Sequence, residues 1–256
     1  MPNRKVVLLW VFFMAFVPAA IGQGQDSKEE AAKPVALKRF YFGAHLSILG
    51  IPLTRAASYT RATSSPAYKL ENTGTRTGSR WGTGASVQFN FNRRFSLNMN
   101  LLHHDAGYKT DLQVTYGVDN PKTATDERSY YKSSEITHAD YWDLAALARI
   151  YYGPRAGGRF QRFLDIGPAY RRMSNIRTSR EITNVDASTC CSEIPATPVH
   201  KAVPGVVIGA GIQAVDDFGI KVTPEVRYTR WLWNAVDVTA ARSNKNQVEF
   251  VIGVSF

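Results

Sequence analysis

Apolar and polar residues alternate along much of this chain with a period of two. Between residues 247 and 256, every even-numbered position is apolar, whereas the odd-numbered positions include Gln247, Glu249 and Ser255. Successive side chains of a β-strand point to opposite sides of the sheet, so this pattern predicts a strand with one apolar and one polar face. The final residue, Phe256, falls on the apolar face.

The same alternation recurs in seven earlier segments. Together with residues 247–256, this makes eight segments: residues 40–48, 81–91, 95–101, 143–151, 164–171, 206–213, 220–229 and 247–256. Segments of about ten residues have the length of a tilted strand that crosses a lipid bilayer. Strands with one lipid face and one interior face predict an all-β fold, an eight-stranded antiparallel up-and-down transmembrane β-barrel.

The connections between these segments alternate between short and long. Short connections fall near residues 92–94, 153–162 and 216–219, and long ones fall near residues 50–79, 105–137, 174–202 and 233–245. Short turns on one side and long loops on the other are the arrangement of barrels in the bacterial outer membrane. Because the number of strands is even, we expect both ends of the barrel on the short-turn side, in the periplasm.

The N-terminal residues predict export. Arg4 and Lys5 precede an almost wholly apolar run at residues 6–17, and Ala20 and Gly22 form a small-x-small cleavage site. These features are typical of a secretory signal peptide, although an uncleaved anchor is the alternative. The expected organisation is a signal peptide at residues 1–22, a flexible periplasmic segment at residues 23–37, and an outer-membrane β-barrel domain at residues 38–256.

Four short stretches resemble a known family. They are residues 165–168 (Asp-Ile-Gly-Pro), 209–211 (Gly-Ala-Gly), 224–231 (Pro-Glu-Val-Arg-Tyr-Thr-Arg-Trp) and 253–256 (Gly-Val-Ser-Phe). In order and spacing they resemble the bacterial outer-membrane β-barrel domain family, which includes OmpA-like and OmpW-like small porin-family proteins. The resemblance covers about residues 38 to 256. It implies that Phe256, with apolar residues at alternate preceding positions, is the signal read by the barrel-assembly machinery.

The chain is basic, with a formal net charge of +10. A basic balance favours either nucleic acid or an anionic membrane as a partner. Export and the scattering of the charges argue against nucleic acid, which leaves outer-membrane lipids and lipopolysaccharide. In the first long loop the bases outnumber the single acid, Glu71, so this loop is a candidate for contact with lipopolysaccharide phosphates. Its bases are Arg55, Arg61, Lys69 and Arg76.

Aromatic residues gather near both ends of the predicted strands. The tryptophans beside the long loops are Trp81, Trp142, Trp231 and Trp233, and the aromatic residues near the short turns or chain ends are Phe40, Phe42, Phe91, Phe95, Tyr152, Phe163 and Phe256. Two rings of aromatic side chains match the two interfaces of a membrane. We therefore expect the four tryptophans to form an aromatic girdle at the long-loop interface.

The face opposite the apolar one carries equal numbers of acids and bases. They are Asp143, Asp165, Glu225 and Glu249 against Arg149, Arg171, Lys221 and Arg227. The interior of an eight-stranded barrel is filled by its own side chains, and buried charges must be paired. These residues therefore predict a salt-bridged network that plugs the lumen, with a gated ion path as the alternative. Neutralising Arg227 should destabilise the barrel in the first case and raise its conductance in the second.

Candidates for catalysis are few. We expect His45 in the lumen, and His103 and His104 at a strand end in contact with lipid headgroups. No serine is spaced so that it must contact His103 or His138, and nucleophilic catalysis requires such a contact. The only cysteines, Cys190 and Cys191, are adjacent and cannot form a disulfide framework or a metal cluster. No catalytic, cofactor-binding or metal site is predicted.

These observations leave several hypotheses about the role of the protein. The first is a non-enzymatic outer-membrane barrel with a structural or surface-interaction role, which we expect to be a monomer. The second is a narrow channel or carrier for small or apolar solutes, as in OmpW-like barrels. A lipid A-modifying hydrolase is the third. A soluble lipocalin-like barrel is the fourth, but it would be apolar inside, which the charges opposite Phe256 disfavour.

Overall fold

The computed structural model describes residues 39–64, 67–118, 121–122, 128–156, 160–183, 200–216, 218–238 and 241–256. The predicted signal peptide, the segment 23–37 and the two cysteines lie outside these residues. Among the residues that are described, no helix is long and apolar enough to span a membrane.

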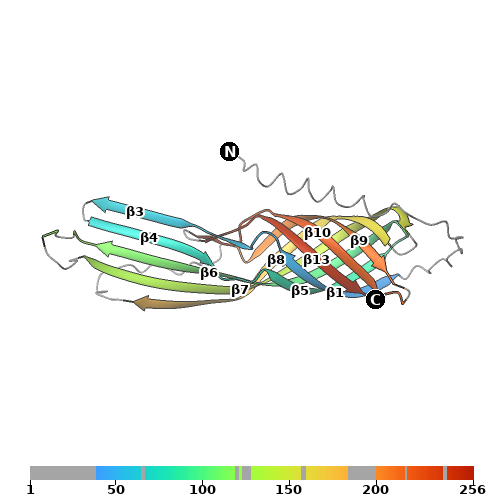
Figure 1. Ribbon diagram of the computed structural model, residues 1–256, viewed down its shortest axis with the longest axis horizontal. Coiled ribbons are helices and arrows are strands. Elements are labelled where there is room, and N and C mark those ends of the chain that lie inside the picture. The colour runs from blue at the N-terminus through green and yellow to red at the C-terminus, as the bar shows by residue number, and fades with distance from the viewer. Residues whose placement is uncertain are drawn as a thin grey trace, which may run out of the picture. The chain divides into compact units, whose positions relative to one another are not determined.

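Eight strands pair in an antiparallel ring (Figure 1). In chain order they are β1 (Phe40–Leu49), β5 (Trp81–Asn90), β6 (Phe95–Tyr116), β7 (Ser129–Ala156), β8 (Phe160–Thr183), β9 (Ala202–Val215), β10 (Lys221–Trp231) and β13 (Asn246–Ser255). Each strand pairs with the next in this order, and β13 pairs with β1 to close the ring. The predicted eight-stranded antiparallel up-and-down barrel is therefore confirmed.

Three strands of the ring are longer than predicted. β6, β7 and β8 have 22, 28 and 24 residues, and beyond the ring they continue as a sheet that β3 (Ser58–Ser64) and β4 (Ala67–Arg76) extend (Figure 1). Much of the segments 50–79, 105–137 and 174–202, predicted as loops, is therefore strand. On β6 the sequence pattern reverses there, because Lys109, Asp111 and Gln113 replace apolar residues on the outward face. We call this sheet the extension.

A second, smaller sheet lies where the ring meets the extension. It is formed by β2 (Thr54–Ala56), β11 (Asp237–Val238) and β12 (Ala241–Ser243), in the order β11-β12-β2. Oγ1 of Thr54 donates a hydrogen bond of 3.2 Å to the carbonyl oxygen of Gly107 on β6, which ties this sheet to the ring. Asn244 donates another, of 2.7 Å, to the carbonyl oxygen of Pro52.

The opposite end of the ring is closed by tight turns. Between β5 and β6, Oδ1 of Asn92 accepts hydrogen bonds of 2.8 Å from the backbone nitrogens of both Arg94 and Phe95. Between β9 and β10, Oδ1 of Asp216 accepts a bond of 2.7 Å from the nitrogen of Ile220, and Gly219 has a φ of 83°. Asn and Asp favour such turns because their side chains cap nearby backbone donors. We call this the short-turn end.

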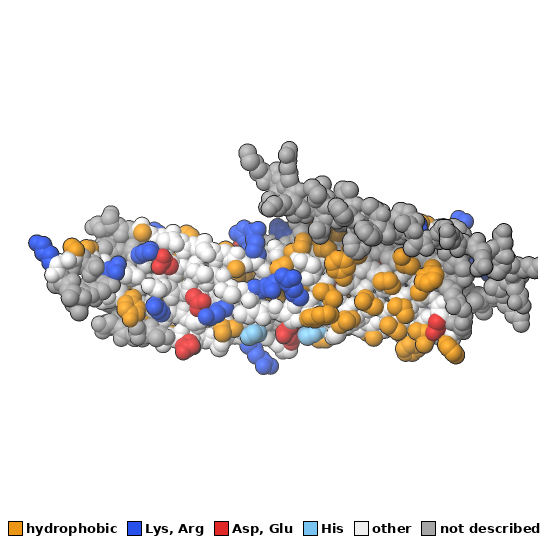
Figure 2. Space-filling model, in the orientation of Figure 1, with side chains coloured by type: hydrophobic (Ala, Val, Ile, Leu, Met, Phe, Trp, Pro, Cys, Tyr) orange, Lys and Arg blue, Asp and Glu red, His pale blue; other side chains and the backbone are white. Residues whose placement is uncertain are grey.

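The outward faces of the ring strands carry large exposed apolar side chains. Phe42 and Ile208 are each 54 % exposed and Ile252 is 48 % exposed. Figure 2 shows this apolar surface over the ring, and charged and polar side chains over the extension. We call it the apolar belt; its residues include Leu46, Val87, Met99, Leu101, Leu144, Ile150, Leu164, Ile166, Val206, Ile208, Val222, Phe250, Ile252 and Val254.

Gly167 occupies a position in β8 where no side chain fits. A Cβ atom there would overlap the carbonyl oxygen of Ala146 and lie 3.0 Å from the Cα of Leu147. Because both neighbours are backbone atoms of β7, no rotamer change relieves the contact. We expect Gly167→Ala to lower the free energy of unfolding in urea by about 1–3 kcal/mol. Gly50→Ala is the control, since a Cβ atom at Gly50 would lie no nearer than 3.4 Å to another atom, the carbonyl oxygen of Val248. Equal losses of stability in both variants would contradict this account.

Candidate functional site

Two strands bring most of the predicted charges together. Asp143 and Arg149 lie six positions apart on β7, and Asp165 and Arg171 lie six positions apart on β8. The antiparallel register places Asp143 opposite Arg171 and Arg149 opposite Asp165. Because six is an even number, all four side chains point to the same face of the sheet. That face is the interior of the ring, and all four residues are buried there.

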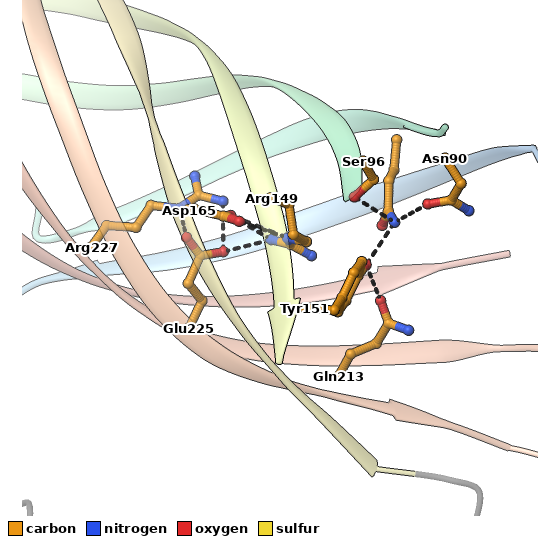
Figure 3. A network of polar contacts seen from close by, with 9 residues as sticks. Asn90, Ser96, Arg149, Tyr151, Asp165, Gln213, Glu225 and Arg227 are labelled. Atoms are coloured by element: carbon orange, nitrogen blue, oxygen red, sulfur yellow. Dashed lines mark hydrogen bonds and ion pairs between the residues drawn. The ribbon is translucent and has the colours of Figure 1, made fainter. Parts of the chain in front are cut away.

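Nearer the short-turn end, four charged side chains form a continuous chain (Figure 3). Nε and Nη2 of Arg149 donate hydrogen bonds of 2.9 and 2.7 Å to the two carboxylate oxygens of Asp165. The same Nη2 lies 3.2 Å from Oε2 of Glu225, whose carboxylate in turn accepts bonds of 2.6 and 2.9 Å from Arg227. The guanidinium of Arg149 also lies 3.7 Å from the ring centroid of Phe163. Buried ions need such pairing, and here each has it.

A layer of neutral polar side chains lies next to this chain of ions (Figure 3). The hydroxyl of Tyr151 donates to Oε1 of Gln213 at 2.7 Å and accepts from Nε2 of Gln88 at 2.8 Å. Nε2 of Gln88 also lies 2.6 Å from Oδ1 of Asn90. These contacts join side chains of β5, β7 and β9 across the interior.

A second cluster of ions lies nearer the extension. Nε and Nη2 of Arg171 donate to the carboxylate of Asp143 at 2.7 and 2.5 Å, and Nη2 also donates to Oε1 of Gln247 at 2.5 Å. The guanidinium lies 4.1 Å from the ring centroid of Trp231 and 4.8 Å from that of Tyr141. Nε1 of Trp231 donates to the same oxygen of Gln247 at 3.0 Å. Cation–π contacts of this kind are strongest where water is excluded.

Lys221 and Glu249, the remaining predicted charges, also face the interior. Nζ of Lys221 lies 3.1 Å from the ring centroid of Tyr41. Oε1 of Glu249 lies 3.1 Å from Nε2 of His104, an ion-pair distance without hydrogen-bond geometry. The same nitrogen is 4.0 Å from a carboxylate oxygen of Asp143. His104 is fully buried, so its predicted contact with lipid headgroups is wrong. On β6 the odd positions face outward, and an even-numbered residue must face in.

The same alternation shows that two aromatic residues were predicted on the wrong face of the barrel. Trp231 is 2 % exposed and Phe163 is fully buried, so neither lies in an outer aromatic ring. On β10 the odd positions from Lys221 onward face inward, and Trp231 continues that series. Trp81, Trp142 and Trp233 do lie on the outside, 56, 41 and 49 % exposed.

Apolar side chains fill the interior where the ring meets the extension. Leu49, Tyr141 and Leu147 of the ring belong to the same buried cluster as Leu53, Val236 and Ala241 of the segments around the small sheet. Along the inward positions of β7 from the short-turn end, the large side chains follow in the order Tyr151, Arg149, Leu147, Asp143 and Tyr141. From the short-turn end the interior is therefore layered: neutral polar, ionic, apolar at Leu147, ionic again, and then apolar.

One side of the interior is different. Ser47 of β1 and Asn98 and Asn100 of β6 are buried, and each has a side-chain polar atom without a hydrogen-bond partner in the described part of the chain. His45 on β1 is similar, because its Nδ1 has no such partner either. These residues face inward from β1 and β6, whereas the ion chain extends from β7, β8 and β10.

In the described residues, the possible metal ligands and the outward histidine of β6 can be compared with what metal binding and nucleophilic catalysis require. Within those ranges, no three side chains of His, Cys, Asp or Glu lie close enough together to hold a metal ion. His103 faces outward, with its ring 4.6 Å from that of Trp142 and its Nε2 3.5 Å from Oδ1 of Asp140. Neither neighbour supplies the hydroxyl or thiol that nucleophilic catalysis requires.

Comparison with known proteins yields structural likenesses only. No family model and no curated protein matches the sequence. Among solved structures, the attachment invasion locus protein Ail of Yersinia pestis, in complex with the heparin analogue sucrose octasulfate, has a TM-score of 0.35 and 8 % identity, covering 85 % of this chain and 97 % of Ail. LpxR from Salmonella typhimurium has a TM-score of 0.28 and 7 % identity, covering 84 % of this chain and 99 % of LpxR. The fold of this chain is assigned from its own strand pairing.

Proposed function

We propose that this chain is an integral outer-membrane β-barrel protein, exported through a cleaved signal peptide, with a structural or surface-interaction role and no enzymatic activity. The observation that carries the proposal is that the polarity of the two faces of the barrel is the opposite of that in a soluble barrel. Apolar side chains lie exposed on the outside of the ring, and paired ions fill its inside. A closed ring leaves no unpaired strand edge in the lipid, which is why barrels can span a membrane.

A soluble barrel does not fit the same side chains. The fourth hypothesis, a lipocalin-like barrel, requires apolar residues inside and polar residues outside. Here Ile208 and Ile252 are about half exposed, while Arg149 and Asp165 are 2 and 1 % exposed. Continuous apolar surface of this extent marks a membrane or partner contact.

A closed lumen is supported by the layers of side chains that cross it. The ion chain from Asp165 to Arg227 joins three strands, and the apolar cluster around Leu53 and Val236 lies between it and the extension. Eight-stranded barrels are narrow enough to be filled in this way. The ions therefore act as a core.

A role at the cell surface is supported by the extension. Its outward face is polar, and two of its lysines lie at ion-pair distance from carboxylates: Lys69 lies 2.8 Å from Glu71, and Lys109 lies 3.0 Å from Asp111. A solvated sheet that continues from a rigid barrel is a suitable platform for binding, which concentrates on segments held by a scaffold. With the short-turn end in the periplasm, the extension would lie outside the cell.

Assembly through the C-terminal residue is part of the proposal. Phe256 is 67 % exposed, and its backbone exchanges hydrogen bonds of 3.0 and 3.1 Å with Phe42 of β1. The terminal aromatic side chain therefore points outward at the seam where the first and last strands meet. This position supports recognition by the barrel-assembly machinery.

Insertion and conductance test the proposal together. We expect the full chain to refold into lipid vesicles, with heat-modifiable mobility on gels, and to give no current steps in planar bilayers because its lumen is filled. Protein that remains soluble without detergent would contradict the membrane proposal. Insertion with discrete current steps would contradict only the closed lumen.

A narrow channel or carrier for small or apolar solutes is the second candidate. The unpaired buried atoms of Ser47, Asn98 and Asn100 favour it, since buried polar groups without a protein partner are ordinarily satisfied by water. Under this hypothesis Asn100→Leu would reduce the conductance. A lipid A-modifying hydrolase is less favoured, and mass spectrometry of lipid A after incubation with the protein tests it directly.

A further inference from the structure

Two strands of the barrel end the apolar belt with the same pattern. On β8 the outward residues are apolar from Leu164 to Tyr170, and the next outward residue is Arg172. On β10 they are apolar up to Tyr228, and the next is Arg230. Both arginines are exposed. A tyrosine followed two positions later by an arginine is therefore repeated at the extension side of the belt.

The strand between them brings a third cation to the same place. Arg172 pairs with Ala202 at the start of β9, and Arg230 pairs with Val206 further along it. Lys201, which is exposed, precedes Ala202, and its carbonyl oxygen accepts a hydrogen bond of 2.8 Å from the nitrogen of Met173. The residues of β9 that pair with the two arginines, Ala202 and Val206, are four positions apart, about 13 Å along the strand. We call Arg172, Lys201 and Arg230 the basic rim.

Positive charge on the basic rim is not neutralised by the protein. Among the described residues, none of its three side chains forms an ion pair with a carboxylate. Arg230 donates from Nη1 to Oδ1 of Asn246, which also accepts a bond of 2.8 Å from the hydroxyl of Tyr228. A neutral amide thus holds this arginine in place and leaves its charge available.

The exposed side chain of Arg242 differs from those of the basic rim, because it is paired with a carboxylate. Nε of Arg242 lies 2.7 Å from Oδ1 of Asp237, and this hydrogen bond lowers the pKa of the Asp237 carboxyl below its usual value. On the opposite side of the barrel, the boundary of the belt is acidic, because Asp105 of β6 pairs with Asp140 of β7. The belt boundary therefore carries the basic rim at β8, β9 and β10 and two carboxylates at β6 and β7.

We infer that the basic rim binds the phosphate groups of an anionic glycolipid in the outer leaflet, with a doubly phosphorylated headgroup spanning the two arginines. This inference rests on the proposed membrane function. Guanidinium groups bind phosphate with two parallel hydrogen bonds, and Tyr170 and Tyr228 lie beside them where aromatic residues contact headgroups. Trp233, whose ring lies 6.0 Å from that of His200, adds a further exposed aromatic side chain near Lys201.

Titration of the refolded full chain with diphosphoryl lipid A tests this inference, with bound lipid counted by native mass spectrometry. We expect the double variant Arg172→Gln/Arg230→Gln to bind at least about tenfold more weakly than wild type, since each cation near an anionic headgroup contributes separately. Arg93→Gln/Arg94→Gln is the matched control, because it removes the same charge from two exposed positions in the β5–β6 turn, at the short-turn end. Its affinity should stay within about twofold of wild type. Wild type should bind monophosphoryl lipid A more weakly than diphosphoryl lipid A, but more tightly than the double variant binds diphosphoryl lipid A.

Several results would overturn the inference. Equal affinity of the double variant and wild type would show that the arginines do not bind the headgroup. Displacement by inorganic phosphate at equal concentration would show a site for the free ion. If the double variant, the control variant and wild type all insert into vesicles and bind lipid A with the same affinity, the inferred lipid site is wrong and the proposed membrane function stands. If wild type itself fails to insert, both are wrong.

Discussion

Replacing Arg149 with methionine should lower the free energy of unfolding by about 3–5 kcal/mol, because the change leaves a buried carboxylate without its partner. The guanidinium is 2 % exposed and bonds both Asp165 and Glu225. Glu225 retains Arg227 in the variant, but Asp165 loses its hydrogen-bonding partner in an environment that water does not solvate. Equilibrium unfolding in urea, in vesicles or detergent, measures the loss.

A second substitution identifies the cause. Adding Asp165→Leu to Arg149→Met removes the abandoned carboxylate, and an apolar pair can replace a buried ion pair at little cost. We expect the double variant to recover most of the lost stability. Arg93→Met, in the exposed β5–β6 turn, should change it by less than about 0.5 kcal/mol. A double variant no more stable than Arg149→Met would mean that the loss comes from removed contacts with Phe163 instead of an unpaired charge.

Introducing an arginine into the apolar belt should cost about 2–4 kcal/mol of folding free energy in a bilayer, whereas the same residue on the extension should cost almost nothing. Met99 and Gln113 suit this comparison, since both lie at odd positions of β6 and face outward. Met99 is 46 % exposed within the belt, and Gln113 lies beyond it, between Glu71 and Lys132. Met99→Arg places a charge in lipid, and Gln113→Arg places it in water.

Folding into vesicles of defined thickness measures both variants. We expect Gln113→Arg to stay within about 0.5 kcal/mol of wild type. Similar costs at the two sites would mean that the belt does not face hydrocarbon, and the membrane assignment would fail with it. Because strand, face and introduced residue are the same, β-propensity does not account for a difference between them.

The two faces of the barrel strands can be predicted from sequence because a strand places alternate residues on opposite sides. This rule identifies the belt, the inward position of Arg149 and Glu225, and the balance of four acids with four bases. Applied along β10 and β6, the same rule places Trp231 and His104 inside, where both are buried, although their chemistry favours the membrane interface. For these two residues, position along the strand is a better guide than residue type.

Other features depend on information that alternation does not carry. Arg149 meets Glu225, 76 residues away, because of the stagger between strands around the ring, and no local pattern reports that stagger. The extension escapes prediction for a different reason. Beyond Asp105 the outward positions of β6 become polar, as at Lys109 and Gln113, while the inward positions include apolar residues such as Leu112 and Val114. The polarity of the two faces therefore reverses within one strand, and a search for strands with an apolar outward face ends at the reversal.

The repeated spacing on β7 and β8 has a consequence for how the hairpin forms. Asp143 and Arg149 each meet an opposite charge only because the same six-residue interval separates Asp165 from Arg171. Sliding one strand by two residues would keep every side chain on its proper face, yet it would set Asp143 against Met173 or Ala169 and break both cross-strand ion pairs at once. Each solitary ion costs several kcal/mol. The ion pairs thus favour a single register of the two longest strands, whereas apolar side chains, which can replace one another, discriminate poorly between registers.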